Sequence, residues 1–152
     1  MFLKIIGMCA LSFFASAARA EGTPAGTWQV TVGGFSYHTP RSGGENEFNY
    51  GLGVEHQLTA STALQVGVYM NTLKSISNYG LVQYHPFEFL GFRFGASVGV
   101  VDGYSIVNNG KFIPVVLPSF SRQWKHVGIN GVFVPPIDGG QGILFVGFKF
   151  PF

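Results

Sequence analysis

A set of polar residues has the side-chain types and the placement for chemistry. They fall at or near the ends of extended segments of the chain: His38, Arg41, Glu47, Asn71, Thr72 and Tyr79. A histidine beside a hydroxyl can activate it for attack on an acyl carbon. Asn71 or a backbone amide can stabilise the oxyanion that then develops, and Arg41 can bind a lipid phosphate. The alternative is a girdle of hydrogen-bonded loops without chemistry, and spacing alone leaves both interpretations open.

Other kinds of site find little support. His56, His85 and His126 are dispersed without metal-ligand spacing, so we expect neither a metal nor another cofactor. There is no Walker loop, and Gly51-x-Gly53 lies inside an expected strand, where it is no nucleotide fingerprint. His85 and His126 are expected at the end of the molecule away from His38, which argues against a histidine–serine site on the late strands.

The last eleven residues, 142–152, indicate the fold that must position these side chains. Phe148, Phe150 and Phe152 alternate with other residues, so in a strand they share one face. A soluble edge strand would not end in exposed aromatics. A terminal phenylalanine does suit the aromatic girdle of an outer-membrane barrel, whose outer face meets lipid. The alternative is an ordinary C-terminal core strand.

The same period-two pattern recurs along the chain and predicts eight strands. We expect them at residues 27–38, 48–58, 63–71, 78–84, 92–100, 112–121, 126–134 and 142–152, with a bulge at Gly33-Gly34 in the first. Eight is an even number and the smallest closed barrel of this class. The sequence therefore predicts an all-β fold, an eight-stranded antiparallel transmembrane barrel of the outer-membrane type.

The connections between these strands alternate in length. The long ones, residues 39–47, 72–77, 102–111 and 135–141, are expected to face outside the cell, and the short ones to be periplasmic turns. Inward-facing positions are rich in glycine, which makes room for other side chains or a ligand. Four inward polar residues are expected to lock the lower barrel through mutual contacts: Glu55, Gln65, Arg93 and Lys149.

Residues 1–20 have the composition of a cleaved signal peptide, which would leave residues 21–152 as a single barrel domain. The peptide takes Cys9 with it, which excludes a disulfide and a thiol nucleophile in the mature chain. Lys4 and Arg19 also leave, so nine basic side chains become seven, against seven acidic ones. Nothing in this balance suggests a nucleic-acid surface, and we expect the outer membrane of a Gram-negative cell.

Several stretches resemble the lipid A palmitoyltransferase (PagP) family. They are Asn46-Glu47-x-x-Tyr50-Gly51-x-Gly53, Gly67-Val68-Tyr69-Met70-Asn71-Thr72, Ile113-Pro114-Val115-Val116-Leu117-Pro118, Phe133-Val134-Pro135 and Phe148-Lys149-Phe150-Pro151-Phe152. The resemblance implies transfer of a palmitoyl chain from a phospholipid to lipid A by a histidine and an Asp-Ser pair. It also implies that Pro114 or Pro118, together with Pro135, opens a lateral route for lipid, since proline cannot donate to a strand ladder.

The chain departs from this family where the chemistry would occur. The Asp-Ser pair falls on Asn71-Thr72, which keeps a hydroxyl but loses a charge. The family's histidine falls nearer Val32 or Gly33, whereas this chain carries His38. The family's leading amphipathic helix is not evident. The resemblance then implies that His38, Thr72 and Asn71 are catalytic and that Arg41, Glu47 and Tyr79 bind substrate.

Two functions therefore stay open. One is an acyltransferase in which His38, a rim side chain with little part in folding, acts as general base. The other is a non-enzymatic barrel with a structural, adhesive or surface-modifying role. Either would meet phospholipid and lipopolysaccharide, would enter the membrane by barrel-assembly machinery that recognises its last strand, and is expected to be a monomer. A lipid-length apolar interior pocket favours the enzyme, and a plugged interior favours the alternative.

Overall fold

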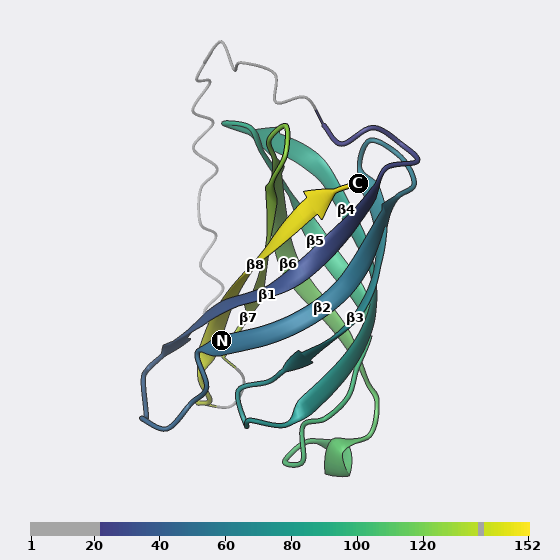
Figure 1. Cartoon of the computed structure of the whole chain (residues 1–152). Helices are drawn as coiled ribbons and strands as arrows, with labels where there is room; N and C mark the ends of the chain where they lie inside the picture. The colour runs from purple at the N-terminus through teal and green to yellow at the C-terminus, as the bar shows by residue number, and fades with distance from the viewer. Residues whose placement is uncertain (1–21, 137–138) are drawn as a thin grey trace, which may run out of the picture.

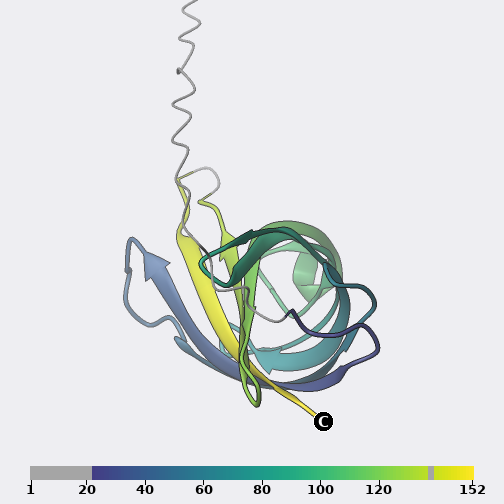
Figure 2. The ribbon, with the colours of Figure 1, turned by 90° about the horizontal axis from the view of Figure 1, so that it is seen from above.

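The chain closes into a barrel. The computed structural model describes residues 22–136 and 139–152, whose eight strands follow one another around a closed antiparallel sheet. Figures 1 and 2 show the strands curving around a common centre. The strands are β1 Trp28–Thr39, β2 Phe48–Gln57, β3 Thr62–Met70, β4 Ile76–Phe89, β5 Phe92–Val101, β6 Ile113–Gln123, β7 Gly128–Val134 and β8 Gly142–Pro151. The predicted fold class is confirmed, and the expected signal peptide lies outside the described residues.

The short and long connections separate to the two ends of the barrel. We call the end that carries the β2–β3, β4–β5 and β6–β7 turns the turn end, and the other the loop end; Figure 1 draws the turn end uppermost. A one-turn 3-10 helix, η1 Asn108–Gly110, belongs to the loop end. Within residues 22–136 and 139–152, no helix has the length and apolar character to cross a membrane.

β4 is longer than the sequence pattern indicated. Residues 85–88 were expected to end it, yet the strand continues to Phe89 and pairs with β5 up to Phe92. The register shifts between Tyr84 and Phe87, so Pro86 sits in a bulge, where the ladder tolerates its missing N–H. The turn is made instead by Leu90 and Gly91, with φ of 51° and 77°. Positive φ at both central residues is the geometry of the two-residue hairpin turn that matches strand twist.

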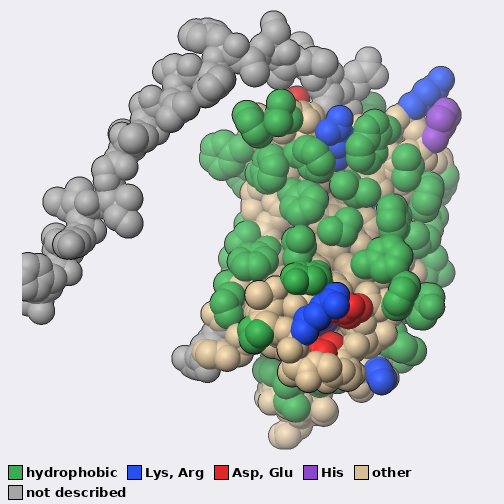
Figure 3. Space-filling view, turned by 90° about the vertical axis from the view of Figure 1, so that its left-hand side faces the viewer, with side chains coloured by type: hydrophobic (Ala, Val, Ile, Leu, Met, Phe, Trp, Pro, Cys, Tyr) green, Lys and Arg blue, Asp and Glu red, His purple; other side chains and the backbone are tan. Residues whose placement is uncertain are grey.

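The side-chain distribution is inverted relative to a soluble protein. Among the described residues the buried apolar side chains are Ala63 and Val101, whereas the buried polar ones include Gln29, Glu55 and Lys149. Large apolar side chains such as Leu52, Val66 and Phe87 stand exposed on the outer wall. Figure 3 shows them as a broad belt on one face, with charged side chains gathered toward the two ends. This distribution suits a wall that meets lipid.

Polar contacts lock the turn-end half of the interior, and one of them joins two of the four residues that were expected to do so. Lys149 of β8 and Glu55 of β2 form an ion pair of 2.7 Å, and their side chains are 2% and 0% exposed. Asn130 of β7 donates to the other Glu55 oxygen at 2.6 Å. The other two residues expected in this network, Gln65 and Arg93, contact different partners. Gln65 accepts a hydrogen bond from Gln83 at 2.7 Å, and Arg93 lies 3.7 Å from Glu88. The central pair therefore joins β2, β7 and β8 across the interior.

Breaking this pair on one side should destabilise the barrel. Lys149→Met leaves the Glu55 carboxylate buried without its cation, and we expect the free energy of unfolding to fall by about 3–5 kcal/mol. The matched control is Glu55→Gln with Lys149→Met, which removes both charges but keeps an oxygen for Asn130 and should recover most of the loss. Urea unfolding in lipid vesicles measures both. A single variant as stable as the wild type would contradict the role given to the pair.

Candidate functional site

The loop end brings His38 and Thr72 together. His38 Nε2 lies 3.2 Å from Thr72 Oγ1, although the two residues are 34 positions apart. The β-bulge in β1 makes this contact possible. The register shifts between Val32 and Gly34 against both neighbouring strands, as the sequence predicted. Strict alternation from the inward-facing Thr31 would turn His38 outward, and the extra residue of the bulge returns it to the interior.

His38 is enclosed rather than placed on an exposed rim. Its side chain is 0% exposed, so the expectation that it plays little part in folding is wrong. Among the described residues, Nδ1 has no hydrogen-bond partner. With the proton on Nε2, the ring donates to Thr72 and keeps a free lone pair on Nδ1, which is the arrangement that a general base requires. Because the side chain is fully enclosed, this nitrogen does not meet solvent in the structure as described.

The side chain of Asn71 forms hydrogen bonds that order the loop carrying Thr72. Its side chain is buried, and Nδ2 donates to Ser77 Oγ at 2.9 Å and to the Gly103 carbonyl at 3.0 Å. Its Oδ1 accepts from the backbone N–H groups of Leu73 and Ser75 at 2.9 and 3.1 Å. With every polar atom engaged, this amide orders the β3–β4 connection and holds the adjacent Thr72 toward His38.

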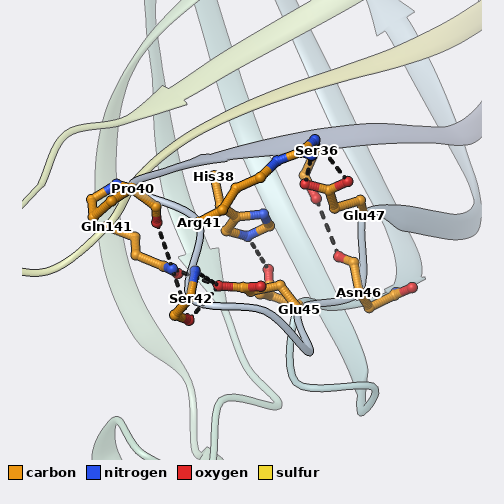
Figure 4. A network of polar contacts seen from close by, with 10 residues as sticks. Ser36, His38, Pro40, Arg41, Ser42, Glu45, Asn46, Glu47 and Gln141 are labelled. Carbon is orange, nitrogen blue, oxygen red and sulfur yellow. Dashed lines mark hydrogen bonds and ion pairs between the residues drawn. The ribbon is translucent and has the colours of Figure 1, made fainter.

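A second set of contacts ties two loops together over this end of the barrel. Gln141, before β8, donates to the Pro40 carbonyl at 2.8 Å and to the Glu45 carboxylate in the β1–β2 loop (Figure 4). Hydrogen bonds from Gln141, and then from Ser42, hold the pKa of the Glu45 carboxyl far below its usual range. This tie was not expected, because nothing local in the sequence pairs residue 141 with residues 40–45.

Arg41 and Glu47 lie apart from His38, on the outer wall. They form an ion pair of 3.1 Å, and the Arg41 guanidinium sits 5.0 Å from the centre of the Tyr37 ring. Next to the pair, a groove of about 310 Å³ crosses β8, β1 and β2 on the outer wall. Its apolar lining is Phe35, Tyr37, Phe48, Leu144 and Val146. The structure therefore divides the predicted site between the two faces of β1.

Tyr79 fills much of the space that the inward-facing glycines leave. Its hydroxyl lies 3.3 Å from Thr31 Oγ1. A Cβ atom at Gly53 or Gly67 would lie 2.7 or 2.6 Å from that hydroxyl, so the ring needs glycine at both positions. Tyr104, from the β5–β6 loop, also reaches the interior and meets Tyr69 hydroxyl to hydroxyl at 2.7 Å; burial raises the pKa of Tyr104. Tyrosines thus pack the loop-end half of the barrel.

The prolines flank a seam between β6 and β7. β6 pairs with β5 along residues 113–121, but its described pairing with β7 covers only Ser119–Gln123 against Gly128–Val132. Pro114 and Pro118 lie on the part of β6 that this ladder leaves out, and Pro135 follows the end of β7. The β6 backbone is thus held on one side only at the loop end.

One further contact lies at the turn end, where the sequence argued against a histidine–serine site. His85 Nε2 lies 2.8 Å from Ser119 Oγ, which accepts from Ser97 at 2.9 Å. All three side chains are buried. The sequence pattern expected His85 in a turn, and only the registers of β4, β5 and β6 bring these residues together.

Comparison with known proteins supports the fold class and goes no further. No family model matches the chain, and no curated protein matches it. A solution NMR structure of a de novo designed barrel, TMB2.3, superposes with a TM-score of 0.59 at 15% identity, over 84% of this chain and 95% of that one. A second structure, from de novo design of transmembrane β-barrels, gives 0.56 at 15% identity, over 86% and 99%. The chain has the fold of a transmembrane β-barrel.

Restoring the acid that the resemblance would place at position 71 should destabilise the loop end. Asn71→Asp replaces the Nδ2 donor by an oxygen that faces the Gly103 carbonyl, and we expect a loss of about 1–3 kcal/mol for each donor removed. Asn109→Asp, on an exposed loop residue, is the control and should stay within about 0.5 kcal/mol. Urea unfolding measures both, and equal stability of the two variants would contradict the structural role of Asn71.

The loop tie can be tested by titration. Gln141→Ala removes the strongest hydrogen bond to the Glu45 carboxylate, so the pKa of Glu45 should rise toward its ordinary value. A lowered folded pKa means that the tie contributes at neutral pH and is lost as the pH falls through that pKa. NMR titration of the Glu45 carboxyl carbon measures the change, with Gln123→Ala at the turn end as control. An unchanged pKa in Gln141→Ala would show that Gln141 does not hold the carboxylate.

Proposed function

We propose that this protein sits in the outer membrane of a Gram-negative cell with its loop end outward, and transfers an acyl chain from a phospholipid to lipid A. The observation that carries the proposal is the His38–Thr72 contact with Nδ1 unoccupied. A base so held, at the end of the barrel nearest the outer leaflet, is placed where lipid A hydroxyl groups lie. The resemblance to the lipid A palmitoyltransferases is the second support.

The proposed step uses His38 first as base and then as acid. Nδ1 takes the proton of a lipid A hydroxyl while the oxygen bonds to the ester carbon of the phospholipid. The tetrahedral intermediate then expels the lysophospholipid oxygen, which recovers that proton from the imidazolium as the ester bond breaks. In this step Nε2 carries the other ring proton and Thr72 Oγ1, 3.2 Å away, accepts it in a hydrogen bond that orients the ring, and Asn71 positions Thr72. Tyr79 contacts the acyl chain once its ring turns away from Gly53.

The seam between β6 and β7 supplies the route by which lipid enters. Backbone hydrogen bonds are the main contacts between neighbouring strands, so strands part most easily where no ladder forms. Pro114 and Pro118 remove donors from β6, and Pro135 bounds the opposite side. The arrangement supports passage of a phospholipid chain sideways from the membrane, rather than through the mouth that Gln141 ties shut.

The packed interior favours the second candidate, a non-enzymatic barrel. Tyr79 fills the space beside Gly53, and the Glu55–Lys149 pair fills the turn-end half. A structural, adhesive or surface-modifying barrel needs no pocket, and its loops would carry its role. In either case we propose that the protein is a monomer and that barrel-assembly machinery recognises β8, which carries the alternating Phe148 and Phe150.

Mass spectrometry of lipid A from cells with and without the gene separates the two candidates. The acyltransferase adds one acyl chain, and His38→Gln should lower that product at least about a hundredfold, since it removes the base. His126→Gln, on an exposed histidine at the turn end, is the matched control. Heat-modifiable gel mobility checks that each variant folds. Unaltered lipid A in cells that contain folded wild-type protein would sink the enzymatic proposal.

The lateral route has its own test, because the mature chain carries no cysteine of its own. Continuing the Ser119–Val132 register by two residues sets Leu117 opposite Val134, so Leu117→Cys with Val134→Cys should close the seam by a disulfide. We expect acyl transfer to stop when the pair is oxidised and to return on reduction. Leu117→Cys with Ser97→Cys, across the intact β5–β6 ladder, should leave transfer unchanged. Transfer that persists in the oxidised seam variant would rule this route out.

A further inference from the structure

The groove on the outer wall joins an apolar floor to a pair of opposite charges. The β1–β2 and β1–β8 registers set Phe35 against Phe48 and Val146, and Tyr37 against Leu144. These side chains point outward, where the wall meets lipid, and they form the groove of about 310 Å³. That volume is at the lower end for small-molecule sites. It therefore suits part of one acyl chain rather than a whole lipid.

Arg41 and Glu47 stand together at the loop-end margin of this groove. Their side chains are 59% and 33% exposed, and an ion pair in such a position contributes little to stability. The Arg41 guanidinium lies over the Tyr37 ring, which orients it, and only one of its nitrogen atoms contacts Glu47. The margin thus offers a phosphate-binding cation next to an ammonium-binding carboxylate, which lie side by side in Figure 4.

We propose that the groove binds a zwitterionic phospholipid whose headgroup carries a primary ammonium, that is, a phosphatidylethanolamine. The phosphate pairs with Arg41, the ammonium with Glu47, and an acyl chain lies along the apolar floor. The Glu47 carboxylate disfavours a purely anionic headgroup, because it neutralises Arg41 and would face negative charge. This inference deepens the substrate-binding role of Arg41 and Glu47 and rests on the proposed membrane location, but not on acyl transfer, since His38 faces the interior.

Lipid retention tests the proposal directly. The detergent-solubilised full mature chain is incubated with vesicles of equal parts phosphatidylethanolamine and phosphatidylglycerol, washed, and the retained lipids are counted by native mass spectrometry. We expect the wild type to retain phosphatidylethanolamine about tenfold over phosphatidylglycerol. Glu47→Gln should reverse that preference, because it frees the Arg41 charge. Arg41→Gln should lose both lipids.

Two more variants separate the groove from general surface charge. Val146→Trp fills the floor and leaves both charges in place, so it should lose both lipids as well. Lys111→Gln removes a cation from the loop end away from the groove and should match the wild type. Each variant is compared only after it shows the heat-modifiable gel shift of the folded barrel.

Equal retention of the two lipids by the wild type would overturn the proposal, and so would an unchanged preference in Glu47→Gln. These results are distinguishable from failure of the proposed function. Wild-type protein that selects phosphatidylethanolamine but leaves lipid A unaltered sinks acyl transfer and keeps the groove. Protein that acylates lipid A but shows no headgroup preference sinks the groove alone.

Discussion

The pairing of β1 with β8 is the contact on which the rest of the structure depends. In a hydrocarbon layer no water is available to backbone N–H and C=O groups, so a sheet that crosses it must have no open edge. The ladder from Gln29–Pro151 to Thr39–Gly142 removes the two edges that an open eight-stranded sheet would expose. Closure allows the inverted arrangement of side chains, with polar groups inside and apolar groups on the wall. The short seam between β6 and β7 is notable because it relaxes this constraint at one place.

Two glycines decide which side chains at the loop end of β1 face the interior. A Cβ at Gly33 would lie 1.9 Å from the Asn49 carbonyl oxygen, and one at Gly34 would lie 1.8 Å from that of Val146. Only glycine allows this close approach, and the bulge that results turns His38 inward and Tyr37 outward. The same device therefore creates both the enclosed His38–Thr72 contact and the outer groove at Tyr37. A single local irregularity thus places an interior contact and an outer groove on opposite faces of one strand.

The interior has two halves of different character. In the turn-end half, charges that would be costly alone are paired and hydrogen-bonded, which fixes the strands that carry them. In the loop-end half, tyrosine rings stand against glycines, and rings can turn without breaking an ion pair. Any chemistry at His38 therefore belongs to the loop-end half, whose side chains can rearrange. The ion pair of the turn-end half keeps the strands in place. The fold itself, like the designed barrels it superposes on, does not choose between an enzyme and a passive barrel.

Much of the barrel was predictable from local pattern, because the period-two alternation of each strand is written in neighbouring residues. The eight strands, their inward and outward faces and the Gly33-Gly34 bulge follow from it, and the placing of residues 38 and 72 at the same end follows from the alternating direction of the strands. The end of β4 could not be predicted in this way. A proline at position 86 is typical of a turn, and only the pairing with β5 shows that Pro86 lies in a bulge. The engagement of every polar atom of Asn71, the Gln141 tie, the seam and the His85–Ser119 contact are likewise absent from local pattern. They arise from register and loop packing between distant segments, which set the neighbours of each side chain and which alternation along one strand does not encode.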